Sequence, residues 1–552
     1  MKAFLSRSSH KFRQYLWILP ALGAGITIRF YHLSSQIIGG DEIHTVRIAL
    51  QKPLGWILTH YVSTDNCIPL TAFYRVQMDL GAVFTEMAFR LPVLVLGIVF
   101  LIIAPLALKE KIGKRPAIVF SWLIALSPLL VFYSRMVRPY MANVLLGFAA
   151  VMCFFVWLDR GNKPASIAYA VLSASAIFFH LTTAPFVLAP LAYFIFDWGT
   201  RKDRDHKEFV WFLVVAGCTA GFILLFLIPA LPSLIPFVTE KAMDSSIRWR
   251  TAGGFSHLFA GTSRPLMTVL FWILCVWGLA KLLIKNSRFG LYCLWLIVAQ
   301  LSAILIVSPF GVISPLIFSR YALVTLPFIL VWLASGLAGP WWKNQNKPAR
   351  WAQKAFAMVF VAVLFLTGPL TKPQFFAGSF AHHTYELNFQ VPSPSVSDDM
   401  VPRFYRKLEK MPAGALIEYP WDWIWPRSMA FDVYQNRHRR EVIVSGAWSL
   451  FADDRIKLRN NVPVSPKLFL SSRAKYIVVH LDLFQEEKQV ISSLHRAYRA
   501  SRLSQKNFWD RMKKMGTGLA DKLERLWGPP SYRDRFIRVW DLDKVRDRNN
   551  NQ

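Results

Sequence analysis

Three carboxylates that could take part in acid–base chemistry lie in one stretch between the first two apolar runs of the sequence. Asp41 and Glu42 are adjacent and follow Gly39-Gly40, which permits a tight turn, and Asp65 lies further along the same stretch. A carboxylate at this place could remove a proton from a hydroxyl group or help to hold a divalent cation. The alternative is that these carboxylates are ordinary solvated loop residues.

Arginines that could bind an anion follow the third apolar run and precede the tenth. The first group is the segment Ser134–Tyr140, which contains Arg135 and Arg138, and the second is Ser319-Arg320-Tyr321. Arginines at the outer end of a span run against the usual distribution of positive charge, so we expect Arg135 and Arg138 to have an anionic partner. Phosphate suits a guanidinium group because the two bind in a bidentate manner. The alternative is that these side chains reach towards lipid headgroups.

Long apolar runs must position these residues. Hydrophobic residues make up 54% of the 552 residues and charged residues 18%, and the mean hydropathy is +0.33. This composition excludes a disordered chain and a small secreted scaffold. We count eleven runs of roughly 17–23 residues, the length that a bilayer requires, and therefore predict a mainly α-helical polytopic membrane protein. The runs lie near residues 15–31, 90–108, 117–133, 140–158, 165–180, 183–198, 208–230, 266–284, 290–308, 321–339 and 353–370.

The basic spacers between the runs predict the topology. Basic residues are concentrated at the N-terminus and near 109–116, 199–210, 281–288 and 342–354, and these spacers share one side if the eleven runs alternate. That side is then cytoplasmic, and the tail after residue 371 lies outside the cytoplasm, which fits a plasma membrane protein. His180 ends the fifth run on the outer side. A lone histidine at such a place is more often structural than catalytic.

The net charge of +31 does not indicate nucleic-acid binding in this chain. Much of the basic excess lies in short spacers between apolar runs, where it marks topology and contacts with anionic membrane lipids, and no nucleic-acid-binding motif is present. The five cysteines are widely spaced and show no metal-ligand spacing, so we expect neither a disulfide framework nor a structural zinc site.

Two regions differ from simple connectors between spans. The loop 34–89 has amphipathic character around 42–51 and 70–80, which predicts short helices at the outer membrane interface, although a solvated loop is the alternative. We divide the chain into a membrane domain (1–371), a linker (372–402) and an extracytoplasmic α/β domain (403–552), because strand-like and helical patterns alternate in the tail. The expected strands are 415–419, 441–445, 474–481 and 536–542, and the expected helices are 484–499 and 504–526.

The order of these motifs resembles the lipid-dependent glycosyltransferases of the C-type membrane fold. The resemblance covers about residues 10–340 and is closest to the protein-mannosyltransferase and aminoarabinose-transferase branch, which includes bacterial enzymes that add sugars to lipopolysaccharide cores. The chain departs from the family at Cys67, where many members have histidine, and at Met136, where many have an acidic residue. The motifs that carry the resemblance are Gly40-Asp41-Glu42, Asp65…Pro69-Leu70, Phe89–Pro92, Ser127–Tyr140 and Arg320-Tyr321…Pro327.

The resemblance implies a sugar donor linked to polyprenyl phosphate and a glycan, lipid or protein acceptor at the outer membrane surface. Arg138 and Arg320 would then stabilise the leaving phosphate, with Tyr140 and Tyr321 as hydroxyl donors and His180 as a further contact. An apolar groove between spans would hold the prenyl chain.

The same resemblance implies a role for the loop carboxylates. Asp41 would be the base that deprotonates the acceptor as it attacks the anomeric carbon with inversion. Glu42 and Asp65 would orient Asp41 or the sugar, or would hold a possible divalent cation.

Two other classes of function remain open at this point. A transporter or flippase of a lipid-linked substrate would also need outer arginines, but it would place charges near mid-membrane and often consists of two related halves. A non-catalytic membrane scaffold that displays the basic tail would tolerate the loss of Asp41.

Overall fold

The computed structural model divides the chain into two compact units. The first unit comprises Met1–Ser34 and Ile48–Lys372, and the second comprises Ser35–Arg47 and Pro373–Gln552. Asp65 and the expected strand 441–445 lie outside the described residues. Apart from a few isolated residues, the structure describes 16–31, 41–62, 67–82, 86–202, 205–241, 249–309, 312–338, 347–371, 401–408, 410–412, 414–420, 466–470, 474–490 and 506–550.

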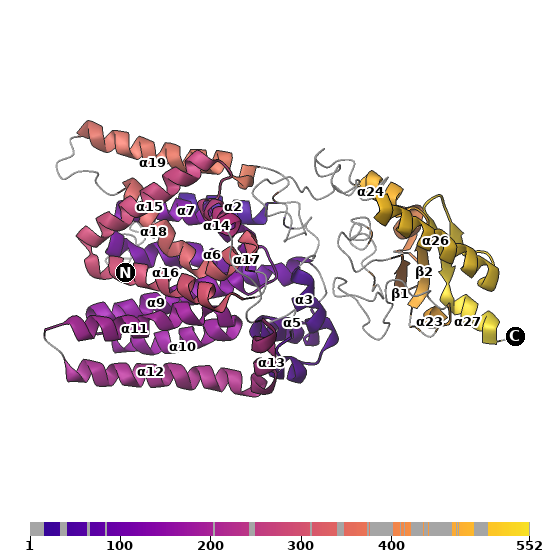
Figure 1. Cartoon of the computed structure of the whole chain (residues 1–552), viewed down its shortest axis with the longest axis horizontal. Coiled ribbons are helices and arrows are strands. Elements are labelled where there is room, and N and C mark those ends of the chain that lie inside the picture. Colours follow the sequence, from indigo (N-terminus) through magenta and orange to yellow (C-terminus); the bar gives the residue numbers. More distant parts are fainter. Residues whose placement is uncertain are drawn as a thin grey trace, which may run out of the picture. The chain divides into compact units, whose positions relative to one another are not determined.

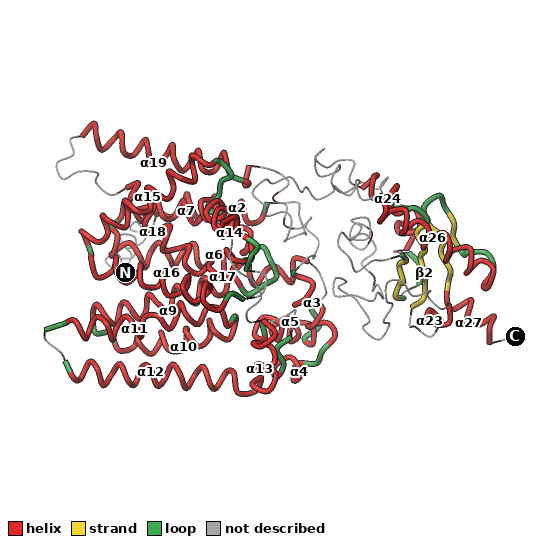
Figure 2. Tube along the Cα trace, in the orientation of Figure 1, coloured by secondary structure: helices red, strands yellow, loops and turns green. Residues whose placement is uncertain are grey.

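The first unit is a bundle of helices (Figures 1 and 2). Each of the eleven apolar runs coincides with a helix or a bent pair of helices, so the predicted polytopic helical architecture is confirmed. Within the described part of the chain, eight helices are long and apolar enough to cross a membrane, and α7 with α8, bent by 56°, gives a ninth. The helices Leu16–Phe30 and Lys163–Phe179 are apolar but shorter.

The helices that match the runs follow one another along the chain with short connections. They are η1 (Leu16–Ile18) with α2 (Leu19–Phe30), α6 (Glu86–Ile112), α7 (Lys114–Ala125) with α8 (Pro128–Ser134), α9 (Tyr140–Arg160), α10 (Lys163–Phe179), η3 (Leu181–Thr183) with α11 (Ala184–Thr200), α12 (His206–Leu227), α15 (Pro265–Lys285), α16 (Ser287–Val307), α17 (Pro315–Ala322) with η5 (Leu323–Thr325) and α18 (Leu326–Ala338), and α19 (Lys347–Thr367) with η6 (Pro369–Thr371).

Short helices fill the longer connections. The helices expected near 42–51 and 70–80 are present as α3 (Glu42–Gln51) and α5 (Ile68–Asp79), with α4 (Leu54–Thr59) between them. After α12 come η4 (Ile228–Ala230), α13 (Leu231–Lys241) and α14 (Trp249–Ala260). The Tyr61 ring stacks on Phe237 of α13, and the Tyr61 N–H donates to Ser233 Oγ at 2.8 Å. The segment around Tyr61 is therefore packed against α13.

Close packing in the bundle depends on glycine where α15 and α18 meet. A Cβ atom on Gly278 would lie 1.7 Å from the carbonyl oxygen of Trp332, and one on Gly336 would lie 2.3 Å from the carbonyl oxygen of Leu274. Small residues of this kind let the backbones of membrane helices approach closely.

Charged side chains tie several helix ends together at one end of the bundle. Lys111 at the end of α6 pairs with Asp159 at the end of α9, and Lys285 at the end of α15 donates to the carbonyl of Ile112. Arg288 of α16 pairs with Asp197 of α11. Because the helices alternate in direction, the turns that carry Arg138 and His180 lie at the opposite end of the bundle.

The second unit contains a four-stranded mixed sheet in the order β1-β2-β4-β3. β1 (Ala415–Tyr419) runs parallel to β2 (Ala474–His480), and β4 (Ile537–Asp541) pairs antiparallel with β2 and with β3 (Tyr532–Arg533). Three expected strands are confirmed, and β3 was missed because it has only two residues. The helices around the sheet are α21 (Arg403–Leu408), α23 (Pro466–Leu470), α24 (Leu483–Val490), α26 (Lys506–Trp527) and α27 (Leu542–Asn550).

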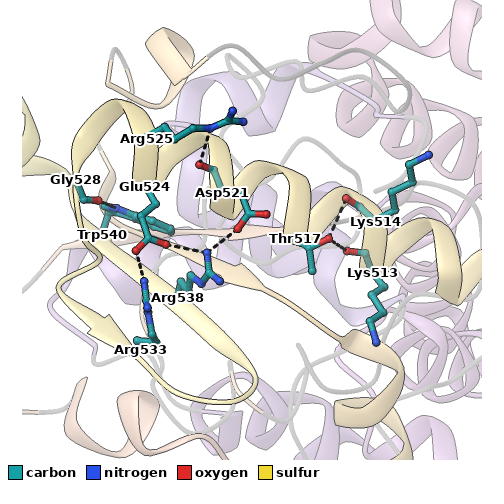
Figure 3. A network of polar contacts seen from close by, with 10 residues as sticks. All are labelled: Lys513, Lys514, Thr517, Asp521, Glu524, Arg525, Gly528, Arg533, Arg538 and Trp540. Carbon is teal, nitrogen blue, oxygen red and sulfur yellow. Dashed lines mark hydrogen bonds and ion pairs between the residues drawn. The ribbon is translucent and has the colours of Figure 1, made fainter.

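The helix α26 is fixed to the sheet by both apolar and charged contacts. Leu519 and Leu523 are buried in the core on one face of the sheet, together with Ile477 and Val479 of β2. Figure 3 shows that Arg538 of β4 reaches both Asp521 and Glu524, while Trp540 donates to the carbonyl of Gly528. The expected helix 504–526 is therefore confirmed, and the described part of 484–499 is the helix α24.

Candidate functional site

Two arginines from distant parts of the sequence meet at one tyrosine ring. Arg138 lies in the turn between α8 and α9, is 5% exposed, and its guanidinium carbon lies 6.0 Å from the centre of the Tyr140 ring. The guanidinium carbon of Arg320, a half-buried residue of α17, lies 5.3 Å from the same ring. The negative face of an aromatic ring attracts cations, so Tyr140 helps to hold two like charges near each other.

Two further residues complete this cluster. The His180 ring lies 5.6 Å from the Tyr140 ring and 6.0 Å from the Tyr321 ring, and Arg320 lies 5.8 Å from the Tyr321 ring. The structure therefore brings together all five residues that the sequence proposed for phosphate or sugar binding. We call Arg138, Tyr140, His180, Arg320 and Tyr321 the arginine cluster.

His180 is neutral in this cluster at ordinary pH. It lies in the turn between α10 and η3, and it is 3% exposed. Burial holds the pKa of its imidazole well below the ordinary value, and the positive charges of Arg138 and Arg320 lower it further. The hydroxyl of Thr182 lies 2.7 Å from His180 Nδ1 and fixes the ring by a hydrogen bond. His180 therefore adds a polar contact to the cluster but no third positive charge.

The other arginine of this turn, Arg135, makes hydrogen bonds to the backbone of α2, and its expected anionic partner stays a prediction. Its Nη1 donates to the carbonyl oxygens of Ile28 at 3.2 Å and of Tyr31 at 2.7 Å. These carbonyls lie at the C-terminal end of α2, where the helix leaves its last acceptors unsatisfied. A guanidinium group at that end also interacts favourably with the helix dipole. Arg135 thus fixes the turn of Arg138 to the end of α2.

A second arginine, on α2 itself, donates to the bent pair α7 and α8. Arg29 of α2 is fully buried, and it donates to the carbonyls of Ala125 and Ile124 at the end of α7 and to the hydroxyl of Ser134 in α8. Arg29 therefore stabilises the bend between α7 and α8, and the two arginines together fix α2 to the bent pair. A charge so near the end of its helix and bonded to backbone does not resemble a mid-membrane transport site.

The carboxylates proposed for catalysis, Asp41 and Glu42, lie at the start of α3. Asp41 and Glu42 belong to the second compact unit, whereas the cluster belongs to the first. Asp41 immediately precedes α3, and Glu42 is its first residue, where a helix dipole favours negative charge. Both side chains are buried, at 7% and 4% exposure, which differs from solvated loop residues. Asp65 lies outside the described residues.

No grouping of three or more histidine, cysteine or acidic residues in the described part of the chain could hold a metal ion. Sequence reasoning also missed two polar residues beside the cluster, Thr182 and Gln300. Thr182 is an ordinary residue of a turn and gave no signal. Gln300 is a lone amide in an apolar run, and a polar group at such a place is costly enough to indicate a specific contact.

The second unit has a buried polar network of its own. Tyr405 donates to Glu418 Oε1 at 2.8 Å and lies 3.3 Å from His480 Nε2, while His480 Nδ1 lies 3.0 Å from Glu486 Oε2. Tyr434 donates to the same carboxylate at 2.7 Å. The carboxylates of Glu486 and Glu418 beside His480 raise the pKa of its imidazole, against the opposing effect of burial. All five side chains are buried, so the network has a structural role within the tail.

Among comparisons with known proteins, only the comparison with solved structures finds matches to this chain. No family model and no curated protein matches the chain. ArnT from Cupriavidus metallidurans has a TM-score of 0.48 at 13% identity, over 77% of this chain and 85% of ArnT. The same protein bound to undecaprenyl phosphate has a TM-score of 0.47 at 14% identity, over 78% and 86%.

Two other solved structures are similar to the same extent. The Archaeoglobus fulgidus oligosaccharyltransferase has a TM-score of 0.49 at 12% identity, over 86% of this chain and 70% of its own. The arabinofuranosyltransferase AftD from mycobacteria has a TM-score of 0.44 at 13% identity, over 84% of this chain and 36% of its own. These neighbours are glycosyltransferases of the C-type membrane fold, the family that the motifs resemble. At TM-scores below 0.5 and identities of 12–14%, this likeness supports no residue role, so such roles depend on the chain itself.

Proposed function

We propose that this protein is a membrane glycosyltransferase that moves a sugar from a polyprenyl-phosphate donor to a glycan, lipid or protein acceptor of the cell envelope. The observation that carries the proposal is the arginine cluster, in which Arg138 and Arg320 approach the same Tyr140 ring. A phosphate bound beside the Tyr140 ring would interact favourably with both guanidinium groups. Undecaprenyl phosphate, present in one similar structure, is the ligand of this class that we propose for the cluster.

The location of the cluster supports a lipid-linked donor. Arg138 and His180 lie in turns at the ends of membrane helices, opposite the end where charged side chains such as Lys111 and Arg288 tie the helices together. A phosphate at that level would leave its prenyl chain among the apolar helices. Basic residues favour the cytoplasmic side, so we assign the cluster to the outer face.

The proposed reaction is a single displacement at the anomeric carbon. The acceptor hydroxyl loses its proton to the carboxylate of Asp41 as its oxygen forms a bond to that carbon. The bond from the carbon to the phosphate oxygen breaks, and its electron pair stays on the phosphate, where Arg138 and Arg320 stabilise the added charge. One displacement inverts the configuration. The hydroxyls of Tyr140 and Tyr321, together with neutral His180, would bind phosphate or sugar oxygens.

The proposed reaction can include a divalent cation but does not require one. Glu42 and Asp65 are the carboxylates that would help Asp41 to hold such a cation, and otherwise they would orient Asp41 or the sugar. Two guanidinium groups already provide the positive charge that a phosphate leaving group needs, so the proposed step does not depend on a metal.

The test is mass analysis of the envelope glycans of a strain that lacks the protein. We expect one glycan to lose a sugar, and wild-type protein to restore it, whereas Asp41→Asn and Arg138→Ala do not. As a matched control, Asp159→Asn removes a carboxylate at the other end of the bundle and should restore the sugar. Unchanged glycans together with accumulation of a lipid-linked substrate would refute the enzyme and favour a transporter. Restoration by Asp41→Asn would remove Asp41 from the chemistry.

A further inference from the structure

We propose that Gln300 is a positioning residue that holds the two halves of the arginine cluster together; this inference rests on the proposed function. Gln300 lies in α16, within an apolar run, and its side chain is fully buried. Its amide nitrogen donates to the carbonyl oxygen of Thr182 and to that of Tyr321, each at 2.9 Å. The two carbonyls belong to segments that are far apart in the sequence, and the ring contact between His180 and Tyr321 joins the same two segments.

Each of these contacts leads directly to a residue of the cluster. Thr182 follows His180 by two positions and binds its Nδ1 at 2.7 Å through the side-chain hydroxyl. Tyr321 is itself a member, and the preceding residue is Arg320. One amide group therefore sets the spacing between the turn that carries His180 and the helix that carries Arg320.

The orientation of the amide is dictated by its partners. A carbonyl oxygen can only accept hydrogen bonds, so the nitrogen of Gln300, which carries two protons, must face both carbonyls. No other uncharged side chain of similar length offers two donors from one atom. Burying an amide inside an apolar helix is unfavourable unless it is hydrogen-bonded, and here the two bonds from the nitrogen offset part of that cost, while Oε1 makes no hydrogen bond within the described part of the chain.

The consequence concerns donor binding rather than folding. Without the amide, the turn after α10 and the helix α17 keep their apolar packing but lose the contact that fixes their spacing. The two guanidinium groups come from different segments, and Arg320 lies on α17. A shift of that segment would change its distance from Arg138, and a misplacement of about 1 Å in a site can cost about 100-fold.

The experiment measures binding of undecaprenyl phosphate to purified protein in lipid nanodiscs, together with the melting temperature. Gln300→Met keeps the length and removes both donors, and we expect about 10- to 100-fold weaker binding with a small change in melting temperature. Gln353→Met is the matched control, because Gln353 is a buried amide of α19 that donates to the carbonyl of Leu337 at 2.9 Å away from the cluster. The control should bind like wild type.

A double variant tests whether Gln300 acts through the cluster. Adding Gln300→Met to Arg320→Ala should weaken binding no further than Arg320→Ala alone, whereas a general structural defect would add its own loss. Additive losses, wild-type binding by Gln300→Met, or an equal loss in Gln353→Met would each overturn the inference. If Gln300→Met does not fold, Gln300→Asn, which keeps the donors on a shorter side chain, replaces it and should bind with intermediate affinity.

The same data separate this inference from the proposed function. If wild-type protein binds undecaprenyl phosphate and Arg320→Ala weakens binding while Gln300→Met does not, only the role of Gln300 fails. If wild-type protein does not bind it, or if Arg320→Ala binds equally well, the assignment of the cluster to a prenyl phosphate fails, and the inference fails with it.

Discussion

Arg135 and Arg138 are three positions apart in one turn, yet the structure predicts opposite consequences for their removal. Arg135 binds the end of α2, whereas Arg138 faces Tyr140 in the arginine cluster. We therefore expect Arg135→Ala to reduce the stability of the membrane unit, and Arg138→Ala to reduce glycosyl transfer or donor binding much more than it reduces stability.

The expected losses of stability and of donor binding follow from the contacts of each side chain. Arg135 makes two charge-assisted hydrogen bonds to Ile28 and Tyr31, each worth about 1.5–3 kcal/mol, offset in part by the lower desolvation of alanine. A net loss of about 2–4 kcal/mol is expected. The ring contact of Arg138 with Tyr140 contributes only about 0.5–1 kcal/mol to stability. Removing a desolvated contact to the phosphate would cost about 2–5 kcal/mol, or about 30- to 5,000-fold in donor affinity or rate.

The assay compares both variants in lipid nanodiscs by thermal unfolding and by binding of undecaprenyl phosphate. Arg138→Lys should recover part of the binding, because an ammonium group supplies charge but not the planar fork. Equal loss of stability in both alanine variants would show that Arg138 is structural as well. Unchanged donor binding in Arg138→Ala would make this residue a lipid or packing contact and would refute the proposed role of the cluster.

Four further predictions concern other parts of the chain. Asp41→Asn should lower transfer by about 10²–10⁴-fold in a membrane assay, since it cannot accept a proton, and a wild-type rate would exclude it as the base. Gly278→Ala should lower the melting temperature, because its Cβ would lie 1.7 Å from the Trp332 carbonyl oxygen; unchanged melting would contradict this packing. A reporter active only outside the cytoplasm should work when fused to the C-terminal end, and a cytoplasm-only signal would refute the topology. The protection of β2 amides from hydrogen exchange, measured relative to the intrinsic exchange rate at each pH, should fall as the pH rises above about 6.5, and His480→Gln should weaken this dependence; protection that does not change with pH would contradict it.

Two titratable groups in the tail determine the direction in which its stability changes with pH. Burial alone would lower the pKa of His480, but the carboxylates of Glu486 and Glu418 outweigh it and hold that pKa above the ordinary value. Burial raises the pKa of Glu486, against the opposing effects of His480 and Tyr434. Both groups bind their protons more tightly in the folded tail than in the unfolded chain. The stability that they contribute is therefore complete in mild acid and is lost as the pH rises through the folded pKa of His480.

The apolar runs were sufficient to predict the architecture because the bilayer imposes one length and one composition on every span. All eleven runs are helical, and the bend between α7 and α8 is the feature that the pattern could not show. The bend falls at Ser127-Pro128, where a proline begins a new helix, so the residue types were visible but the change of direction was not. The short strand β3 gives no two-residue periodicity and was missed for that reason.

The candidate site was predictable only in part. Arg138, Arg320 and their tyrosines stood out because charged residues at the outer ends of spans are unusual. Arg135 stood out for the same reason, but the sequence did not show that the end of α2 lies beside it and accepts its hydrogen bonds. Gln300 was missed because its two partners are backbone carbonyls, which leave no trace in the residue types of the turns that it connects.

The polar contacts that fix the first unit have one physical origin. The last turn of every helix leaves carbonyl groups without partners, and in an apolar environment these groups are the acceptors most in need of a donor. Arg29 donates to carbonyl groups at the end of α7, and Arg135 donates to carbonyl groups at the end of α2. Gln300 donates to the carbonyl group of Tyr321 in the last turn of α17. A chain with few polar residues in its spans can thus place them accurately by directing buried donors to helix ends. The arginine cluster lies beside two of these contacts, so its geometry depends on helix termini more than on the side chains that line it.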